Sequence, residues 1–270
     1  MERSSVLEVA RGAAWFVALN AVVHFVSAAL AESPLATALA GAVIADLGGS
    51  HLGVRWQESA EVGKPGALGR AARRVGYGLA VAAIAVTITL AVALALGWAS
   101  VGLGRPSWTL GLVVLRTTAA AVRDEILLTG IPFVVATRAR VPAPFALAFA
   151  VVAHGAGFAL FPGVSVTAVA LAVALGGLAA TLWWRHGGLA TAVGAVAGFG
   201  VLTGALLRGA GLYVTWPGSV VHPGLGASGR AAWLAAAVLA AVTAVVVTRE
   251  STGAAGASGA SRWSSRRISG

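Results

Sequence analysis

The chain has no cysteine, a single methionine and few charged residues, which make up only 10% of its 270 positions. The lack of cysteine excludes disulfides, thiolate catalysis and cysteine-ligated metal centres. In soluble domains about a quarter of all residues are charged. A chain that has so few charged residues and is 58% hydrophobic is not expected to fold in water. We expect an all-α, polytopic integral membrane protein.

Acidic residues are also scarce, since the chain has only 9 Asp and Glu residues but 19 Lys and Arg residues. A basic excess can indicate nucleic-acid binding, but these basic residues stand between long apolar runs and form no single basic domain. The positive-inside rule for membrane proteins accounts for them better. We therefore expect membrane lipid as a partner and no nucleic acid.

A helix that crosses a membrane needs about 20 mostly apolar residues. Eight segments of the sequence approach this length, and they lie at 13–31, 35–52, 75–98, 108–137, 145–161, 164–184, 189–207 and 231–248. Residues 1–250 are interpreted as one membrane domain built from a helical bundle. Residues 251–270 are basic and rich in Gly and Ser, which predicts a disordered tail.

The charges of the connecting segments predict the orientation of this bundle. With eight crossings, fourteen Lys and Arg residues fall on the side of the termini. Three fall on the opposite side, namely Arg105, Arg208 and Arg230. The positive-inside rule then places both termini in the cytoplasm.

Three consecutive ionisable residues, Arg123, Asp124 and Glu125, lie inside the fourth apolar segment. Charge at membrane depth is costly and commonly marks a functional site. At about 1.5 Å per residue, Glu125 lies roughly 20 Å and His154 of the next segment roughly 15 Å from the same side of the membrane. The two side chains can therefore meet, and a carboxylate beside an imidazole can activate water. In a purely structural alternative, Asp124 or Glu125 pairs with Arg123 or Arg116 and pins two helices together.

The segment Asp124-Glu125-Ile126-Leu127-Leu128-Thr129-Gly130, followed by His154, resembles motifs of the CPBP family of intramembrane proteases. This family includes CAAX prenyl proteases and bacteriocin-processing enzymes, and the similar region covers about 112–211 within a protease-like core of about 108–211. The resemblance implies an endopeptidase of a bacterial-type inner membrane that cleaves membrane-embedded or lipid-adjacent peptides. Asp124, Glu125 and His154 would activate water without a covalent intermediate.

The chain departs from the family pattern at five positions. Asp124 replaces the first Glu of the family motif, and Thr129 replaces its Arg. Ala150 stands at the Phe of the second motif, while Val196 and Gly200 stand at the second His and the Asn of the last. Loss of one oxyanion donor costs on the order of 3 kcal/mol of transition-state stabilisation. The pattern therefore predicts impaired activity.

Other polar residues could compensate for these losses. Asn20 and His24 lie four residues apart on the first segment, so they share one helix face at a depth similar to that of Glu125. Arg123 could replace the missing Arg, although it points about 100° away from Asp124 on a helix. No residues show the spacing of a zinc motif, so no cofactor is expected, and the sequence leaves a metal open.

Two rival functions remain. A non-catalytic pseudoprotease would bind a membrane segment or a partner protease in a protease-like cavity around these residues. The loss of the second His and the Asn favours this hypothesis. A transporter or channel would use Arg116, Arg123, Asp124 and Glu125 as an ion or proton path. No internal repeat or paired broken helices typical of transporters is evident, so this hypothesis ranks third.

Overall fold

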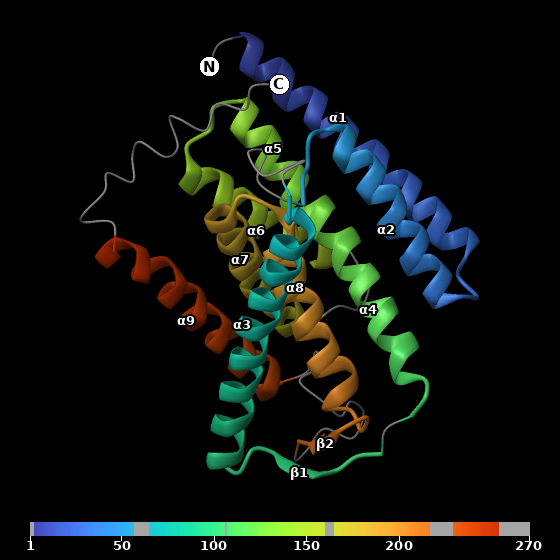
Figure 1. Cartoon of the computed structure of the whole chain (residues 1–270), viewed down its shortest axis with the longest axis vertical. Coiled ribbons are helices and arrows are strands. Elements are labelled where there is room, and N and C mark those ends of the chain that lie inside the picture. The colour runs from blue at the N-terminus through green and yellow to red at the C-terminus, as the bar shows by residue number, and fades with distance from the viewer. Residues whose placement is uncertain (1–2, 57–64, 106, 160–164, 217–228, 254–270) are drawn as a thin grey trace.

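The computed structural model describes residues 3–56, 65–105, 107–159, 165–216 and 229–253, which form a bundle of helices with two short strands at one end (Figure 1). The α-helices are α1 (Arg3–Ala29), α2 (Pro34–His51), α3 (Ala67–Ala95), α4 (Leu110–Glu125), α5 (Ile131–Arg138), α6 (Ala143–Ala159), α7 (Val166–His186), α8 (Leu189–Val201) and α9 (Arg230–Gly253). Two π-helical turns are η2 (Ile126–Gly130) and η3 (Leu202–Leu206), and the strands are β1 (Ser100–Leu103) and β2 (Leu212–Thr215).

Five of the described helical segments are long and apolar enough to cross a membrane: Val6–Ala29, Ala67–Ala95, Val166–His186, Leu189–Leu206 and Arg230–Thr248. Many of their apolar side chains point away from the protein, as Phe25 does with 74% of its surface exposed. Such an apolar exterior matches lipid rather than water. The helical fold class is confirmed and is consistent with a membrane protein, while the number of eight crossings stays a prediction.

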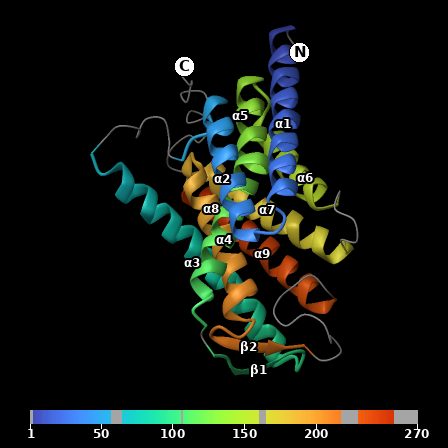
Figure 2. The same cartoon turned by 90° about the vertical axis from the view of Figure 1, so that its right-hand side faces the viewer.

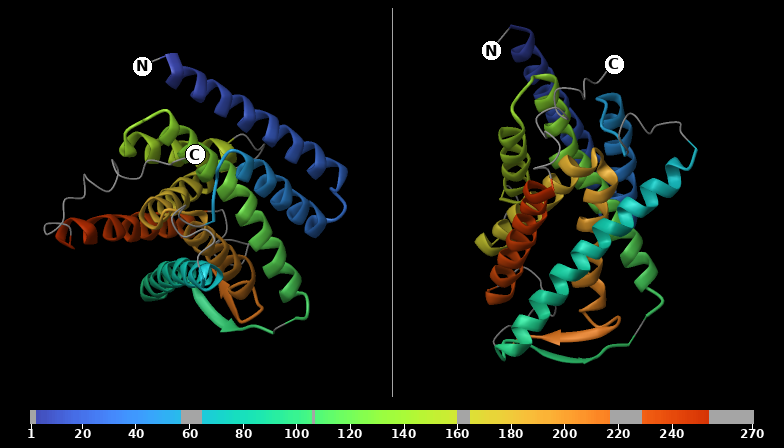
Figure 3. Two further views of the ribbon diagram at one scale, coloured as in Figure 1. Left: turned by 45° about the horizontal axis from the view of Figure 1, so that its top comes forward. Right: turned by 60° about the vertical axis from the view of Figure 1, so that its left-hand side comes forward.

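Helices α1 and α2 form an antiparallel hairpin along one side of the bundle (Figures 1 and 3). Pro34 occupies the first turn of α2, where its missing N–H costs nothing. The Ser33 hydroxyl accepts a hydrogen bond from the Ala36 N–H and so caps this helix. The indole of Trp15 on α1 donates to the Gly48 carbonyl of α2 at 3.1 Å. The hairpin packs on α4 and α5 and thereby covers the charged stretch of the chain.

Helix α8 occupies the centre of the bundle and crosses α3 at very short range. A Cβ atom on Gly78 would lie 2.1 Å from the carbonyl oxygen of Thr191, and one on Gly194 would lie 2.2 Å from that of Val75. Only glycine permits this approach of the two backbones, which is the usual way that membrane helices pack closely. The crossing fixes α8 against α3 on one face, so its opposite face is presented to α4.

The two strands pair antiparallel, with Ser100 opposite Thr215 and Leu103 opposite Leu212. They join the α3–α4 connection to the segment after η3, at the end of the bundle opposite α5 (Figure 2). Both segments lie between predicted crossings, so the strands are an addition to the all-α prediction. Their backbone groups hydrogen-bond to each other in this pairing, although most residues of both strands are exposed.

The fourth predicted segment is divided in the structure into α4, the π turn η2 and α5. The irregular turn ends at Gly130, two residues before Pro132. A proline ring clashes with the carbonyl four residues earlier in a regular α-helix, so a wider turn gives it room.

At the other end of the chain, α9 continues to Gly253, and residues 254–270 of the predicted tail lie outside the described residues.

Candidate functional site

The side chains of Glu125 and His154 contact each other inside the bundle. Glu125 is the last residue of α4 and is fully buried, while His154 lies on α6 with 4% of its surface exposed. The distance between Glu125 Oε1 and His154 Nε2 is 3.0 Å. The contact that equal depth predicted is therefore confirmed.

The second nitrogen of the imidazole determines how this pair shares a proton. His154 Nδ1 lies 3.2 Å from the carbonyl oxygen of Ala150, one turn earlier on α6. A carbonyl only accepts hydrogen bonds, so Nδ1 must carry a proton. The contact between Nε2 and Glu125 then needs one further proton between them, on either the ring or the carboxyl group. The pair is neutral as a unit in both arrangements, which suits its burial at low dielectric.

Helix α7 provides the space that the imidazole needs. A Cβ atom on Gly176 would lie 2.5 Å from His154 Cγ and 2.9 Å from Nδ1. A side chain at this position would therefore displace the ring from Glu125. The adjacent Gly177 has no such contact, because the nearest atom to its Cβ position would be 3.8 Å away, on Val151. Gly176 is therefore a positioning residue for His154.

Two polar atoms in this part of the chain are unsatisfied, one on Glu125 at the end of α4 and one on Thr129 in the π turn η2. Among the described residues, Glu125 Oε2 and Thr129 Oγ1 are buried side-chain oxygens without a hydrogen-bond partner. Thr129 is fully buried and follows Glu125 by four residues within the wide turn. Buried polar groups without a partner are rare and commonly mark a site that binds something, and π turns are frequent at functional sites. In the sequence, Thr129 stands out only as a substitution for arginine.

Asp124 has a different partner from Glu125. Its Oδ1 accepts a hydrogen bond from Arg123 Nε at 2.7 Å, and the two side chains are 31% and 25% exposed. The aliphatic part of Arg123 packs on α2, where a Cβ atom on Gly41 would lie 2.9 Å from Arg123 Cδ. The structural alternative predicted an Asp124–Arg123 pair, but this pair lies within one helix and does not join two. Arg116 is exposed on α4.

The structure does not bring Asn20 and His24 to the Glu125–His154 pair. Asn20 Nδ2 donates to the Phe16 carbonyl of its own helix at 2.8 Å, and His24 is exposed on α1. Helix α1 packs mainly against α2 and α5. His24 has the right depth in the chain but lies on another side of the bundle.

The positions predicted for the second His and the Asn lie on the face of α8 that meets α4. A Cβ atom on Gly200 would lie 2.7 Å from Thr117 Cγ2 of α4. Val196, one turn earlier, packs against the apolar cluster that contains Ile126. Neither residue offers a side-chain donor. Ala150, at the predicted Phe position, is fully buried and acts through its carbonyl, which holds His154.

No family model, curated protein or solved structure matches this chain. The CPBP resemblance therefore stays a prediction that rests on the residues named above. Within the described ranges, no three His, Asp or Glu side chains lie together as metal ligands. The local arrangement is a buried carboxyl–imidazole pair with one carboxyl oxygen unpaired, followed four residues later by the buried, unpaired hydroxyl of Thr129.

Proposed function

We propose that this protein is an integral membrane endopeptidase-like protein of the CPBP type, in which Glu125 and His154 activate water against a peptide bond of a membrane-associated substrate. The observation that carries the proposal is the 3.0 Å contact between Glu125 Oε1 and His154 Nε2, in which the other carboxylate oxygen has no described partner. A general base must lie within hydrogen-bond reach of the proton it removes, and Glu125 Oε2 is free to accept one.

In the proposed reaction, Glu125 Oε2 takes a proton from a water molecule while the water oxygen attacks the scissile carbonyl carbon. The Thr129 hydroxyl lies four residues away and holds the same water in place. The carbon–nitrogen bond then breaks, and the proton passes from Glu125 to the leaving amine. His154 Nε2 holds the Glu125 carboxylate in place before it takes the proton, and the Ala150 carbonyl fixes the orientation of the imidazole. No covalent enzyme intermediate is formed.

The resemblance also assigns Asp124 to water activation. Asp124 pairs with Arg123, so its role in the proposed reaction is secondary to that of Glu125.

The proposed activity is low, because Val196 and Gly200 carry no donor for a developing oxyanion. A second candidate is a pseudoprotease that binds a membrane segment or a partner protease without cleaving it. Two observations favour it. The Glu125 carboxyl group is fully buried, with one oxygen already paired to His154, and no side-chain donor is present at the two α8 positions.

We further propose eight crossings of a bacterial-type inner membrane with both termini in the cytoplasm. The five long apolar segments are joined by three further helical segments to make this number: α2, the continuous α4–η2–α5 segment and the 17-residue α6. The excess of Lys and Arg on the side of the termini supports the orientation. The strands β1 and β2 then lie on the outer side.

Peptidase activity is tested with the purified full-length protein in lipid nanodiscs. The substrates are a library of transmembrane peptides and C-terminal tail peptides, and cleavage is read by mass spectrometry. We expect slow cleavage by the native chain and none by Glu125→Gln or His154→Ala. Glu125→Gln keeps the size of the side chain, so its fold is expected to survive.

Two matched variants control for the loss of a carboxyl group or an imidazole elsewhere. Glu32→Gln changes an exposed carboxylate in the α1–α2 turn, and His51→Ala removes an imidazole from the end of α2. Both are expected to cleave at the native rate. Cleavage that persists in Glu125→Gln contradicts the proposed base. Peptide binding without cleavage in the native chain supports the pseudoprotease instead.

A further inference from the structure

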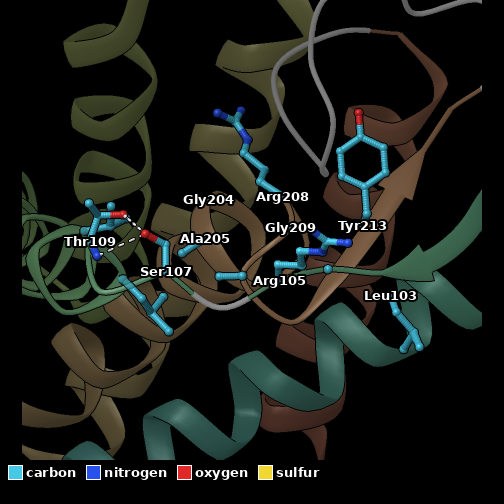
Figure 4. Close-up of a pocket in the computed structure, with 13 residues that line it drawn as sticks. Leu103, Arg105, Ser107, Thr109, Gly204, Ala205, Arg208, Gly209 and Tyr213 are labelled. Atoms are coloured by element: carbon cyan, nitrogen blue, oxygen red, sulfur yellow. Dashed lines mark hydrogen bonds between the residues drawn. The ribbon is translucent and has the colours of Figure 1, made fainter.

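A second polar site lies at the opposite end of α4 from Glu125. A pocket of about 550 Å³ opens between the end of β1, the first turn of α4 and the turn that joins η3 to β2 (Figure 4). The first turn of α4 is 15 residues from Glu125, which is roughly 22 Å along a helix. The pocket is therefore separate from the proposed peptidase site.

A tight backbone contact builds the floor of this pocket. Gly104 donates its N–H to the Gly211 carbonyl at 3.0 Å, and a Cβ atom on Gly104 would lie 2.1 Å from the Gly209 carbonyl oxygen. Gly209 itself has a φ of +117°, which is unfavourable for other residues. The next residue after Gly104 is Arg105, and the residue before Gly209 is Arg208. The glycine contact therefore brings two arginines to one pocket from segments about a hundred residues apart.

Arg208 also forms an antiparallel bridge with Tyr213. Residues directly opposite in such a bridge project to the same side of the ladder, and Figure 4 shows the guanidinium of Arg208 and the phenol ring of Tyr213 on one side of the turn. Both side chains line the pocket, as does Arg105. The site thus combines two guanidinium groups with one phenolic hydroxyl.

The two arginines have no acidic partner in the part of the chain that the structure describes. Ion pairs are found there for Arg123 with Asp124 and for His154 with Glu125, and neither involves Arg105 or Arg208. The third arginine at this end, Arg230, stacks on the Trp98 ring at 5.8 Å. Arg105 and Arg208 therefore keep their guanidinium donors available for a ligand.

The donors of the pocket select an oxygen-rich anion. The planar guanidinium of an arginine can donate two parallel hydrogen bonds to two oxygens of one phosphate group. The pocket also borders the N-terminal end of α4, where the helix dipole favours an anion. We propose that this pocket binds a phosphate group, held between Arg105 and Arg208 and supplied by a phospholipid headgroup or by soluble phosphate.

The surroundings of the pocket suit a phosphate at the membrane interface. Trp108 is 83% exposed and Leu103 is 91% exposed, and both lie at the end of the bundle where α4 begins. Exposed tryptophan is typical of the headgroup level of a bilayer. Leu110 and Val113 add apolar lining beside the arginines. A ligand with a phosphate head and an acyl chain would meet both parts of this lining.

Binding is tested by calorimetry on the full-length protein in an uncharged detergent. The probes are inorganic phosphate, short-chain phosphatidylglycerol, and a diacylglycerol of equal chain length as the control without phosphate. Saturable binding of at least one phosphate-bearing probe and none of the diacylglycerol is expected. Saturation by phosphatidylglycerol alone identifies a lipid headgroup as the source, and saturation by both probes identifies a general phosphate site. Failure of both phosphate-bearing probes overturns the proposal.

Charge variants test whether the two arginines form the site. Arg105→Gln and Arg208→Gln should each weaken binding roughly tenfold, as the loss of one charge-assisted hydrogen bond predicts, and the double variant should abolish saturation. Arg230→Gln removes a charge from the same end but not from the pocket, so it should change the affinity less than about twofold. An equal loss in Arg230→Gln would show non-specific attraction by surface charge and overturn the proposal.

A glycine pair keeps the test valid if the double arginine variant fails to fold. Gly204 lines the pocket, and a Cβ atom there meets nothing within 4 Å, so Gly204→Leu fills the pocket without a clash at Cβ. Gly111 is equally open and is absent from the pocket lining. Gly204→Leu should abolish binding, whereas Gly111→Leu should leave it unchanged. Native affinity in Gly204→Leu would contradict the site.

Discussion

Two neighbouring carboxylates, Asp124 and Glu125, lie in opposite environments. Asp124 is 31% exposed and pairs with the residue beside it, whereas Glu125 is fully buried and reaches another helix. One residue rotates a side chain by about 100° on an α-helix, and this step separates a locally satisfied charge from an inter-helix contact. Each charged residue in such a run therefore has to be interpreted by itself.

The two pairs also differ in what their loss should cost. The Asp124–Arg123 pair lies within one helix, so its loss leaves the contacts between helices intact. A buried pair is costly to break, because the remaining partner is left without compensation. The contrast makes Glu125 and Asp124 natural controls for each other.

The largest effect is expected for Glu125→Ala, which leaves the His154 Nε2 atom buried and unpaired. We expect a loss of about 3–5 kcal/mol in the free energy of unfolding, against less than about 1 kcal/mol for Asp124→Ala. Unfolding in mixed micelles with rising dodecyl sulfate measures both values. Equal losses for the two variants would remove the distinction between the carboxylates.

Gly176→Ala tests the same contact from the side of α7. The new methyl group would overlap the His154 ring, and overpacking of this kind costs about 1–3 kcal/mol. The unfolding measurement should show this loss together with loss of peptide cleavage, because the imidazole leaves Glu125. Gly177→Ala is the matched control, since its Cβ has an ordinary 3.8 Å contact. A Gly177 variant as unstable as the Gly176 variant would point to helix packing in general.

The Glu125–His154 contact could be predicted from the sequence because helix rise is constant, so depth follows from counting residues. Direction around the bundle could not be predicted in this way. His24 has a suitable depth, yet it is exposed on α1, because α1 packs on α2 and α5 rather than on α6. Depth fixes one coordinate of a side chain, and tertiary packing fixes the others.

The π turn and the two strands could not be predicted from the sequence, because the local pattern of residues does not indicate them. The apolar run from Ile126 to Gly130 fits an α-helix and a π turn equally well, so the unpaired Thr129 hydroxyl was not foreseen. Each strand has only four residues, which is too short for an alternating pattern to stand out. Their pairing joins segments separated by more than a hundred residues, and the pocket with Arg105 and Arg208 depends on it.

Thr129→Val separates a structural role of this hydroxyl from a role in holding water. Removal of a buried hydroxyl without a partner should change the free energy of unfolding little or raise it. If peptide cleavage is observed, its kcat should fall roughly tenfold, as loss of one hydrogen bond to the water predicts. Thr191→Val is the matched control, because Thr191 is equally buried and also unpaired but packs at the α3–α8 crossing. A similar fall of kcat in Thr191→Val would argue against a specific role of Thr129.

The smallest effect is expected for the exposed pair itself. A double-mutant cycle with Arg123→Gln and Asp124→Asn isolates the coupling between these two side chains. We expect less than about 1 kcal/mol, because both side chains are partly exposed and their contact lies within one helix. Unfolding in mixed micelles measures it. A coupling above about 2 kcal/mol would mean that Asp124 is held as firmly as Glu125. The proposal that Asp124 and Glu125 have different roles would then be wrong.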